Sequence, residues 1–244
     1  MEQSPAQSEE WSMLHWFDLH VHSFFSADAA SAPEALIAAA RRKGLSGIAI
    51  TDHNSCESAD YCLKHGLMNA EGTPVNGFLV VPGVEVSTAD GHMLCIGTTL
   101  PEMIGVPAVE VEAAILERGG IAIPAHPYDK WRAGIRQEVL DQLKTPVIEG
   151  FNAAVTSRGF NLLAKEYAAR TERRTTAGSD AHHASAVGTA STGFGLDELS
   201  VAALLRAIPH GGALNETYLT RMEGFKKHFG NWFRIFNRDP RKPQ

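Results

Sequence analysis

The chain has 244 residues and a formal net charge of −6, with 44% hydrophobic and 20% charged residues. A chain of this length buries enough apolar surface to fold without disulfides or a structural metal, so a metal site would serve function. The acidic balance argues against a protein that binds long duplex nucleic acid, because phosphates attract a basic surface. Small phosphorylated molecules, or the end of a short strand, remain as candidate partners.

The two ends of the sequence differ in composition from the rest. Residues 1–12 are polar and acidic, lack the apolar core of a signal peptide and predict a disordered leader. One main domain is expected over 13–225, and the basic, aromatic tail 226–244 is expected to pack on it. The three cysteines form no CxxC pair, and no apolar run approaches the length of a membrane span. These features favour a reduced, cytoplasmic setting without membrane contact.

Short apolar runs alternate with helical stretches along the chain. The segment 31–34 (Ser-Ala-Pro-Glu) has the pattern of a capping box and predicts a helix that runs to Lys43. Strands are predicted over 17–21, 46–51, 78–81, 83–87, 92–97, 121–124, 147–151 and 175–178. Further helices are predicted over 58–66, 107–118, 137–143, 161–172 and 196–207. The alternation, with one hairpin near residue 90, predicts parallel strands in an α/β barrel or a doubly wound sheet.

Two histidines lie two positions apart at the end of the first predicted strand. Residues at this spacing face the same side of a strand, so His20 and His22 can bind one metal ion together. The pair alone is weak evidence, because histidines on strands commonly serve packing or face solvent.

Further histidines and carboxylates follow other apolar runs or a glycine turn, namely Asp52, His53, Glu85, His92, His126, Asp180 and His182. Each has an ordinary alternative, since a carboxylate at a strand end often caps the next helix. However, six of the eleven histidines occupy such positions, and the carboxyl ends of barrel strands meet at one edge. The pattern predicts a site for Zn²⁺, Mn²⁺ or Fe²⁺ without thiolate ligands.

Glu85 is the candidate for a carboxylate that bridges two ions. Two ions about 3.5–4 Å apart can activate a water between them and stabilise an in-line displacement at phosphorus. The sequence therefore predicts phosphoester hydrolysis by a hydroxide that bridges the metals, with Glu85 and Asp180 acting through those metals.

Taken in order, these motifs resemble those of the PHP (polymerase and histidinol phosphatase) family. They read Asp18-Leu-His20-Val-His22, Thr51-Asp-His53, Pro82-Gly-Val-Glu85, Ala125-His126-Pro and Gly178-Ser-Asp180-Ala-His182. The resemblance covers most of the chain and implies a distorted (β/α)7 barrel with the metal site at the C-terminal ends of the strands. The Asp90-Gly-His92 segment resembles that of the small stand-alone metal-dependent phosphoesterases of the family.

The resemblance also implies two or three divalent ions (Mn, Zn or Fe) and a ligand set for each. The first ion would be held by His20, His22, Glu85 and Asp180. The second would be held by Glu85, His92 and His126, and the third by Asp28, His53 and His182. Asp28 lies one residue further from the histidine pair than in some relatives. Asp52 would orient a ligand imidazole rather than bind an ion.

Arg158 is the candidate for binding the substrate phosphate, because relatives carry an Asn and an Arg after a strand at this point. A guanidinium can hold a phosphate by two hydrogen bonds. The alternative is a solvated arginine at a helix start. Lys130 and Arg132, after the turn that follows His126, are weaker candidates for the same role.

The leading hypothesis is a metal-dependent phosphoesterase that cleaves phosphomono- or diesters of small nucleotides or of short oligonucleotide 5′ ends. The alternatives are a histidinol-phosphate phosphatase and a non-catalytic PHP module of the kind fused to DNA polymerases. The presence of every expected ligand, without attached polymerase sequence, favours an enzyme. The sequence leaves open the native metal, the choice between mono- and diesterase, and the oligomeric state.

Overall fold

The computed structural model of the chain describes residues 14–219, so the predicted leader and the tail 226–244 lie outside the described residues. The strands are β1 (Leu14–Val21), β2 (Gly47–Ile50), β3 (Leu79–Thr88), β4 (Gly91–Ile96), β5 (Ile121–Pro124), β6 (Val147–Asn152), β7 (Arg174–Gly178), β8 (Ala190–Gly195) and β9 (Ala213–Glu216). The helices are α2 (Pro33–Arg42), α3 (Glu57–Lys64), α4 (Ala108–Glu117), α5 (Gln137–Leu140), α6 (Arg158–Arg170) and α7 (Val201–Ala207).

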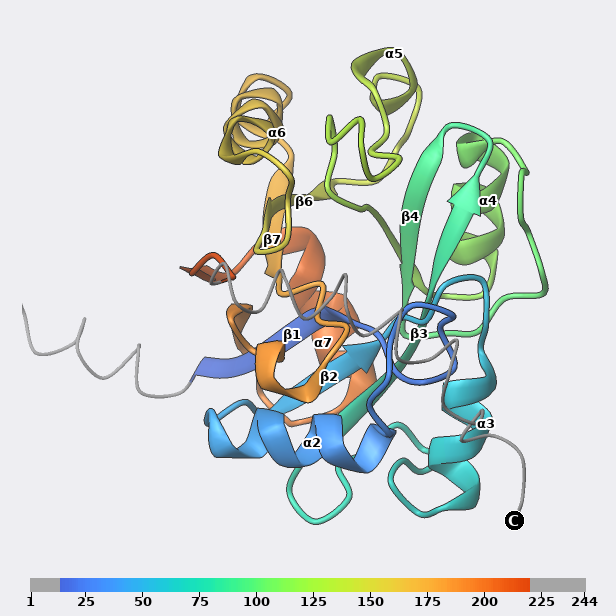
Figure 1. Cartoon of the computed structure of the whole chain (residues 1–244), viewed down its shortest axis with the longest axis vertical. Coiled ribbons are helices and arrows are strands. Elements are labelled where there is room, and N and C mark those ends of the chain that lie inside the picture. The colour runs from blue at the N-terminus through green and yellow to red at the C-terminus, as the bar shows by residue number, and fades with distance from the viewer. Residues whose placement is uncertain (1–13, 220–244) are drawn as a thin grey trace, which may run out of the picture.

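The strands form a curled sheet that closes into a distorted barrel. One sheet has the order β5-β4-β3-β2-β1-β8-β9, and β6 and β7 form a separate parallel pair. This pair contacts β5 on one side and β1 on the other, so strands β1 to β7 form a ring. Helices α2, α3, α4 and α6 lie around its outside (Figure 1). The predicted distorted (β/α)7 barrel is confirmed. No helix within residues 14–219 is long and apolar enough to cross a membrane.

The parallel strands and the hairpin near residue 90 that the sequence predicted are both present, and the sheet has further antiparallel pairs that were not predicted. β1, β2 and β3 are parallel, but the pairs β3–β4, β4–β5, β1–β8 and β8–β9 are antiparallel. A tight turn after Thr88 reverses the chain, and such a hairpin needs no crossover helix. β8 and β9 were not predicted, because their short sequences lack an alternating apolar pattern.

β3 runs without a break through Pro82 and Gly83, where the sequence predicted two separate strands. Pro82 is in register with Ile50 of β2, and its carbonyl accepts a hydrogen bond from Gly97 N at 2.8 Å. A proline removes only one backbone donor, so its acceptor can still hold the strand in place. The continuous strand carries Glu85 into the barrel.

The predicted capping box at the start of α2 does not form. Ala32 is the N-cap residue and has no side-chain cap. Ser31 Oγ instead accepts a hydrogen bond from Ala184 N at 2.9 Å, and Glu34 accepts one from the Tyr61 hydroxyl at 2.9 Å. The capping side chains therefore serve tertiary contacts, which a local pattern does not reveal.

A shift in the pairing of β1 with β2 turns the metal motif inward. The register shifts between Asp18 and Val21. Before the shift, Phe17 packs in a core cluster drawn from the barrel strands and α7, whereas Val21 packs in the cluster against α2. Regular alternation would put these two side chains on one face. An extra residue in a strand re-aims the side chains that follow, and here it directs His20 and His22 toward the barrel interior.

A side chain at Gly47 would collide with both neighbouring strands. An added Cβ would lie 2.4 Å from Leu79 O and 2.6 Å from Phe17 Cε1. We expect Gly47→Ala to lower the free energy of unfolding by about 1–3 kcal/mol, as overpacking does, measured by urea denaturation. Gly195→Ala is the matched control, because no atom lies within 4 Å of a Cβ there. Equal midpoints for the two variants would contradict this packing.

Candidate metal centre

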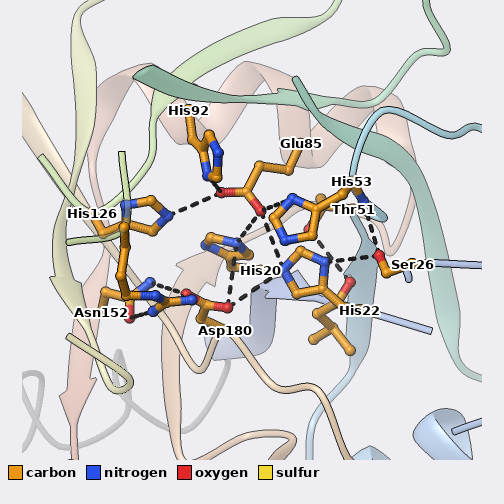
Figure 2. Close-up of polar contacts among 12 residues, drawn as sticks. His20, His22, Ser26, Thr51, His53, Glu85, His92, His126, Asn152 and Asp180 are labelled. Carbon is orange, nitrogen blue, oxygen red and sulfur yellow. Dashed lines mark hydrogen bonds and ion pairs between the residues drawn. The ribbon is translucent and has the colours of Figure 1, made fainter. Parts of the chain in front are cut away.

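The carboxylate of Glu85 stands at the centre of a cluster of histidines (Figure 2). The side chain projects from β3 and is fully buried. Its Oε1 lies 3.0 Å from a ring nitrogen of each of two histidines, His92 and His126. Its Oε2 lies 3.1 to 3.3 Å from a ring nitrogen of each of three more, His20, His22 and His53. One carboxylate therefore faces five imidazoles from separate parts of the chain.

The spacing of these atoms suits donors that share a metal ion. An ion about 2.1 Å from each of two donors places the donors roughly 3.0–3.4 Å apart at ordinary coordination angles. His20 Nε2 and Glu85 Oε2 are buried and make no hydrogen bond within the described residues. Buried polar atoms of this kind carry a desolvation cost that a bound cation removes. The residues present therefore fit a metal ion.

Two further carboxylates complete the cluster. Asp28 Oδ2 lies 2.9 Å from His182 Nε2 and 3.6 Å from His53 Nε2. Asp180 Oδ1 lies 3.4 Å from His22 Nε2 and 3.4 Å from His182 Nδ1. The structure thus brings together all nine residues that the sequence proposed as ligands.

Four sets of three of these residues have donor atoms within 4.8 Å of one another. They are His22, His53 and His182; His20, His22 and Glu85; His20, His126 and Asp180; and His53, Glu85 and His92. The set of His20, His22 and Glu85 lies within the group that the family resemblance implies for the first ion, whereas the other three sets combine residues implied for different ions. The assignment of each residue to a particular ion stays a prediction.

Three imidazoles are held from outside the cluster through Nδ1, namely those of His20, His22 and His182. The partner atoms are, in the same order, Glu149 Oε1 at 3.0 Å, Ser26 Oγ at 3.3 Å and the Asp180 carbonyl oxygen at 2.9 Å. An imidazole that donates from Nδ1 keeps its lone pair on Nε2, which can then bind a metal. The outer contacts therefore set the tautomer that metal binding requires.

Asp52 contacts the histidine cluster indirectly, through Ser26. It accepts hydrogen bonds from Ser23 N, Ser23 Oγ and Ser26 Oγ at 2.6 to 2.8 Å. Ser26 Oγ in turn lies 3.3 Å from His22 Nδ1 and accepts a hydrogen bond from His53 N at 2.9 Å. The orienting role proposed for Asp52 thus reaches the imidazole of His22 by way of Ser26.

Glu149, on β6, is a buried carboxylate that sequence reasoning missed. Its Oε1 lies 3.0 Å from His20 Nδ1, and its Oε2 accepts a hydrogen bond from His126 N at 2.7 Å. A Cβ at Gly178 would lie 2.6 Å from Glu149 Oε1, so only glycine leaves room for this contact. A carboxylate inside an otherwise apolar predicted strand was the available signal.

The structure brings Arg132 to the cluster. Its Nη1 forms an ion pair with Asp180 Oδ2 and lies 3.4 Å from Asn152 Oδ1. Arg158 is exposed at the start of α6, and its guanidinium lies 4.3 Å from the centroid of the Tyr218 ring. The arginine that the sequence ranked lower is therefore the one that contacts a candidate ligand.

Two candidate ligands have a left-handed backbone that non-glycine residues rarely adopt. The φ angle is 31° at His126 and 52° at Asp180. Hydrogen bonds hold both residues there, from His126 N to Glu149 Oε2 at 2.7 Å and from Asp180 N to His20 O at 2.8 Å. Strained backbone maintained in this way is common at functional sites.

The charges of the cluster depend on one another. Burial disfavours ionisation of Glu85, but the facing imidazoles of His53 and His20 hold its pKa well below the usual value. Burial also disfavours charge on His53, yet Glu85 and Asp28 outweigh it and raise the pKa of His53 to about 8. Protons and metal ions therefore compete for the same negative centre.

Two known protein families match this chain. The PHP domain family matches residues 18–168, and the PHP-associated family matches residues 158–212. The chain therefore belongs to the PHP family. An uncharacterized protein of Methanocaldococcus jannaschii is 31% identical over 148 residues, which cover 56% of this chain and 81% of that protein.

Solved structures share the fold. PsfC from Pseudomonas syringae PB-5123 superposes with a TM-score of 0.65 at 16% identity, covering 91% of this chain and 98% of that one. A two-domain protein of Bacteroides vulgatus is described as containing a predicted PHP-like metal-dependent phosphoesterase. It superposes with a TM-score of 0.65 at 18% identity, covering 89% of this chain and 70% of that one. The lesion-specific endonuclease PfuEndoQ of Pyrococcus furiosus superposes with a TM-score of 0.63 at 19% identity, covering 83% of this chain and 57% of that one. At these identities the likeness shows the fold alone.

We expect Glu149→Gln to weaken metal binding about 10- to 100-fold, as loss of an outer carboxylate typically does. The glutamine oxygen would accept the hydrogen bond from His126 N. The amide NH₂ of the glutamine would then donate to His20 Nδ1, which favours the tautomer with the proton on Nε2. The measurement is the dissociation constant for Zn²⁺ by calorimetry. Glu138→Gln, exposed on α5, is the control. Equal constants in both variants would rule out the orienting role.

Proposed function

We propose that this protein hydrolyses phosphate esters of nucleotide-sized molecules, using two or three divalent metal ions held by the cluster. The observation that carries the proposal is the shared Glu85 carboxylate with five imidazoles around it and Arg132 paired to Asp180 at the same site. A cluster that only stored metal would not need a guanidinium beside its ligands. A phosphoryl group, which carries negative oxygens, does benefit from one.

The donor set suits Mn²⁺, Fe²⁺ or Zn²⁺, because it consists of imidazole nitrogens and carboxylate oxygens. When bound, such ions supply an activated water and positive charge toward the phosphoryl oxygens. Glu85 is proposed to join two of the ions, and Asp180 to hold one while it pairs with Arg132.

Arg132 is proposed to bind a phosphoryl oxygen. Within the described part of the chain its polar contacts, with Asp180, Asn152 and the Ala154 carbonyl, all use Nη1. Nη2 and Nε are therefore left for an anion. The strong negative charge of Asp180 also keeps the guanidinium charged despite its burial, since it raises the pKa of Arg132 above the usual value.

The exposure of the ligands indicates where a substrate enters. The side chains of Asp28, His53 and His92 are 30%, 23% and 19% exposed. The other candidate ligands are buried. A phosphate ester is therefore expected to approach from the side of these three residues, with its esterified group toward solvent.

The proposal is tested by the metal content and turnover of one sample. Two to three metals per chain, with hydrolysis of nucleotides, bisphosphorylated nucleosides, histidinol phosphate or short oligonucleotides, are expected. Glu85→Gln should lower kcat by more than about 100-fold and lose part of the metal, because an inner ligand matters more than an outer one. Its circular dichroism should stay unchanged. Less than one metal and no turnover after Mn²⁺ or Zn²⁺ is added would favour the non-catalytic module.

The two arginines are distinguished by a pair of variants. Arg132→Ala should lower kcat/KM about 10²- to 10³-fold, as loss of a donor to the transition-state oxygens does. Arg158→Ala should raise KM by a smaller factor and leave kcat unchanged, because its guanidinium is exposed. Steady-state kinetics on one phosphomonoester measure both. A larger effect at Arg158 would reverse the assignment of the phosphate-binding residue.

A further inference from the structure

The loop from His126 to Gly134, between β5 and α5, forms one wall of the metal centre. It begins with a candidate ligand, and its Arg132 reaches Asp180. The carbonyl of its Ala133 accepts a hydrogen bond from His92 N at 2.8 Å. His92 is one of the three partly exposed ligands, so this loop borders the entrance to the cluster.

The loop is held in one conformation by the buried side chain of Asp129. This carboxylate accepts hydrogen bonds from Trp131 N at 3.1 Å and from Thr156 N and Oγ1 at 2.8 Å. The φ angles of Tyr128 and Ala133 are 68° and 52°, both left-handed. Such strain persists only where surrounding contacts enforce it. The backbone that carries Trp131 and Arg132 is therefore held in one conformation, as binding sites require.

Trp131 has the greatest exposure, 73%, of the large hydrophobic side chains in residues 14–219. Lys130 Nζ lies 5.0 Å from the centroid of its ring. A single exposed apolar residue on an ordinary surface needs no explanation. This one lies beside Arg132 and two positions before Ala133, which touch the metal centre at Asp180 and His92.

Other aromatic side chains near the candidate ligands are already packed, including Tyr128, whose ring contacts that of Tyr167. The rings of Phe24 and Phe25 lie 4.5 Å apart, and both lie within 5.7 Å of the ring of Tyr61. The hydroxyl of Tyr61 donates to Glu34. These side chains cover one another, whereas most of the indole of Trp131 faces solvent.

We infer that Trp131 is a specificity residue that stacks on a flat ring in the esterified part of the substrate, namely a nucleobase. The inference rests on the proposed function and adds to it the chemical class of the group next to the phosphate. A nucleotide carries its base and its phosphate on either side of a sugar, which matches an indole and a guanidinium on adjacent residues. Stacking on an aromatic side chain beside cationic residues is the usual way proteins hold unpaired bases. Lys130 adds positive charge for a second phosphate.

The test is equilibrium binding of two phosphonate analogues, one of adenosine 5′-monophosphate and one of ribose 5-phosphate, to the metal-loaded full chain by calorimetry. Their carbon–phosphorus bond is not hydrolysed, and they differ only in the base. The adenosine compound should bind about 5- to 150-fold more tightly, the range expected for one base stacked on an aromatic ring. Trp131→Ala should abolish this preference and change binding of the ribose compound less than about twofold.

Trp131→Phe should keep most of the preference, because it retains a ring. Leu162→Ala is the control, since Leu162 is 61% exposed on α6 and lies outside the loop from His126 to Gly134. Equal affinity for the two compounds in the wild type, or an unchanged preference in Trp131→Ala, would overturn the inference. A changed sedimentation coefficient in Trp131→Ala would also overturn it, by assigning the ring to a contact between copies of the chain.

Failure of the proposed function gives a different result. In that case the wild type shows no turnover on any phosphoester, while the binding preference and its dependence on Trp131 are still measured directly. Turnover without a preference for the base leaves the hydrolase and removes only the stacking role.

Discussion

The buried carboxylate of Glu85 is the constraint around which the rest of the structure is organised. A carboxylate removed from water is costly unless positive charge surrounds it. Five imidazoles approach it at 3.0 to 3.3 Å, carried by β1, β4 and the segments after β2 and β5. The closed ring of strands brings these distant segments to one point. The barrel and the candidate metal centre therefore depend on the same structure, because the ring of strands that buries the core also brings the donor atoms together.

Two buried carboxylates outside the cluster, those of Asp18 and Glu149, hold the donor-bearing segments in place through hydrogen bonds. Asp18 accepts hydrogen bonds from Ser179 N at 2.9 Å and Gly188 N at 2.7 Å, which ties β1 to the segment that carries Asp180. Burial raises the pKa of Asp18 to about 6 despite these bonds. Glu149 joins β1 to the end of β5 in the same manner. The strands bring the donors close, and these buried carboxylates help to orient His20 and to place the segments that carry His126 and Asp180.

The sequence revealed the parts of the site that a local pattern can encode. The spacing of His20 and His22, together with the histidines and carboxylates that follow several apolar runs, indicated most of the candidate ligands, and the family resemblance added Asp28. What it missed depends on partners distant in the chain. The Ser31 hydroxyl does not cap α2, because it accepts a hydrogen bond from Ala184 N instead. Strand β8 forms because it pairs with β1, and its own composition does not indicate a strand. Glu149 was not identified because its partner His20 is distant in the sequence and only the fold brings the two side chains together.

The division between buried and exposed groups separates chemistry from selectivity. The inner candidate ligands are buried and several of them face the same Glu85 carboxylate, so a substitution among them is expected to disturb more than one of the proposed ions. The entrance is different, because Asp28, His53 and the segment that ends at Gly134 lie in loops beside His92 of β4, and loops vary more readily than barrel strands. The loop that ends at Gly134 joins both regions, since Arg132 faces the ligands and Trp131 faces solvent. Under the proposed function, a rigid loop that carries an inward cation and an outward ring would allow a substrate to be selected without any change to the candidate metal ligands.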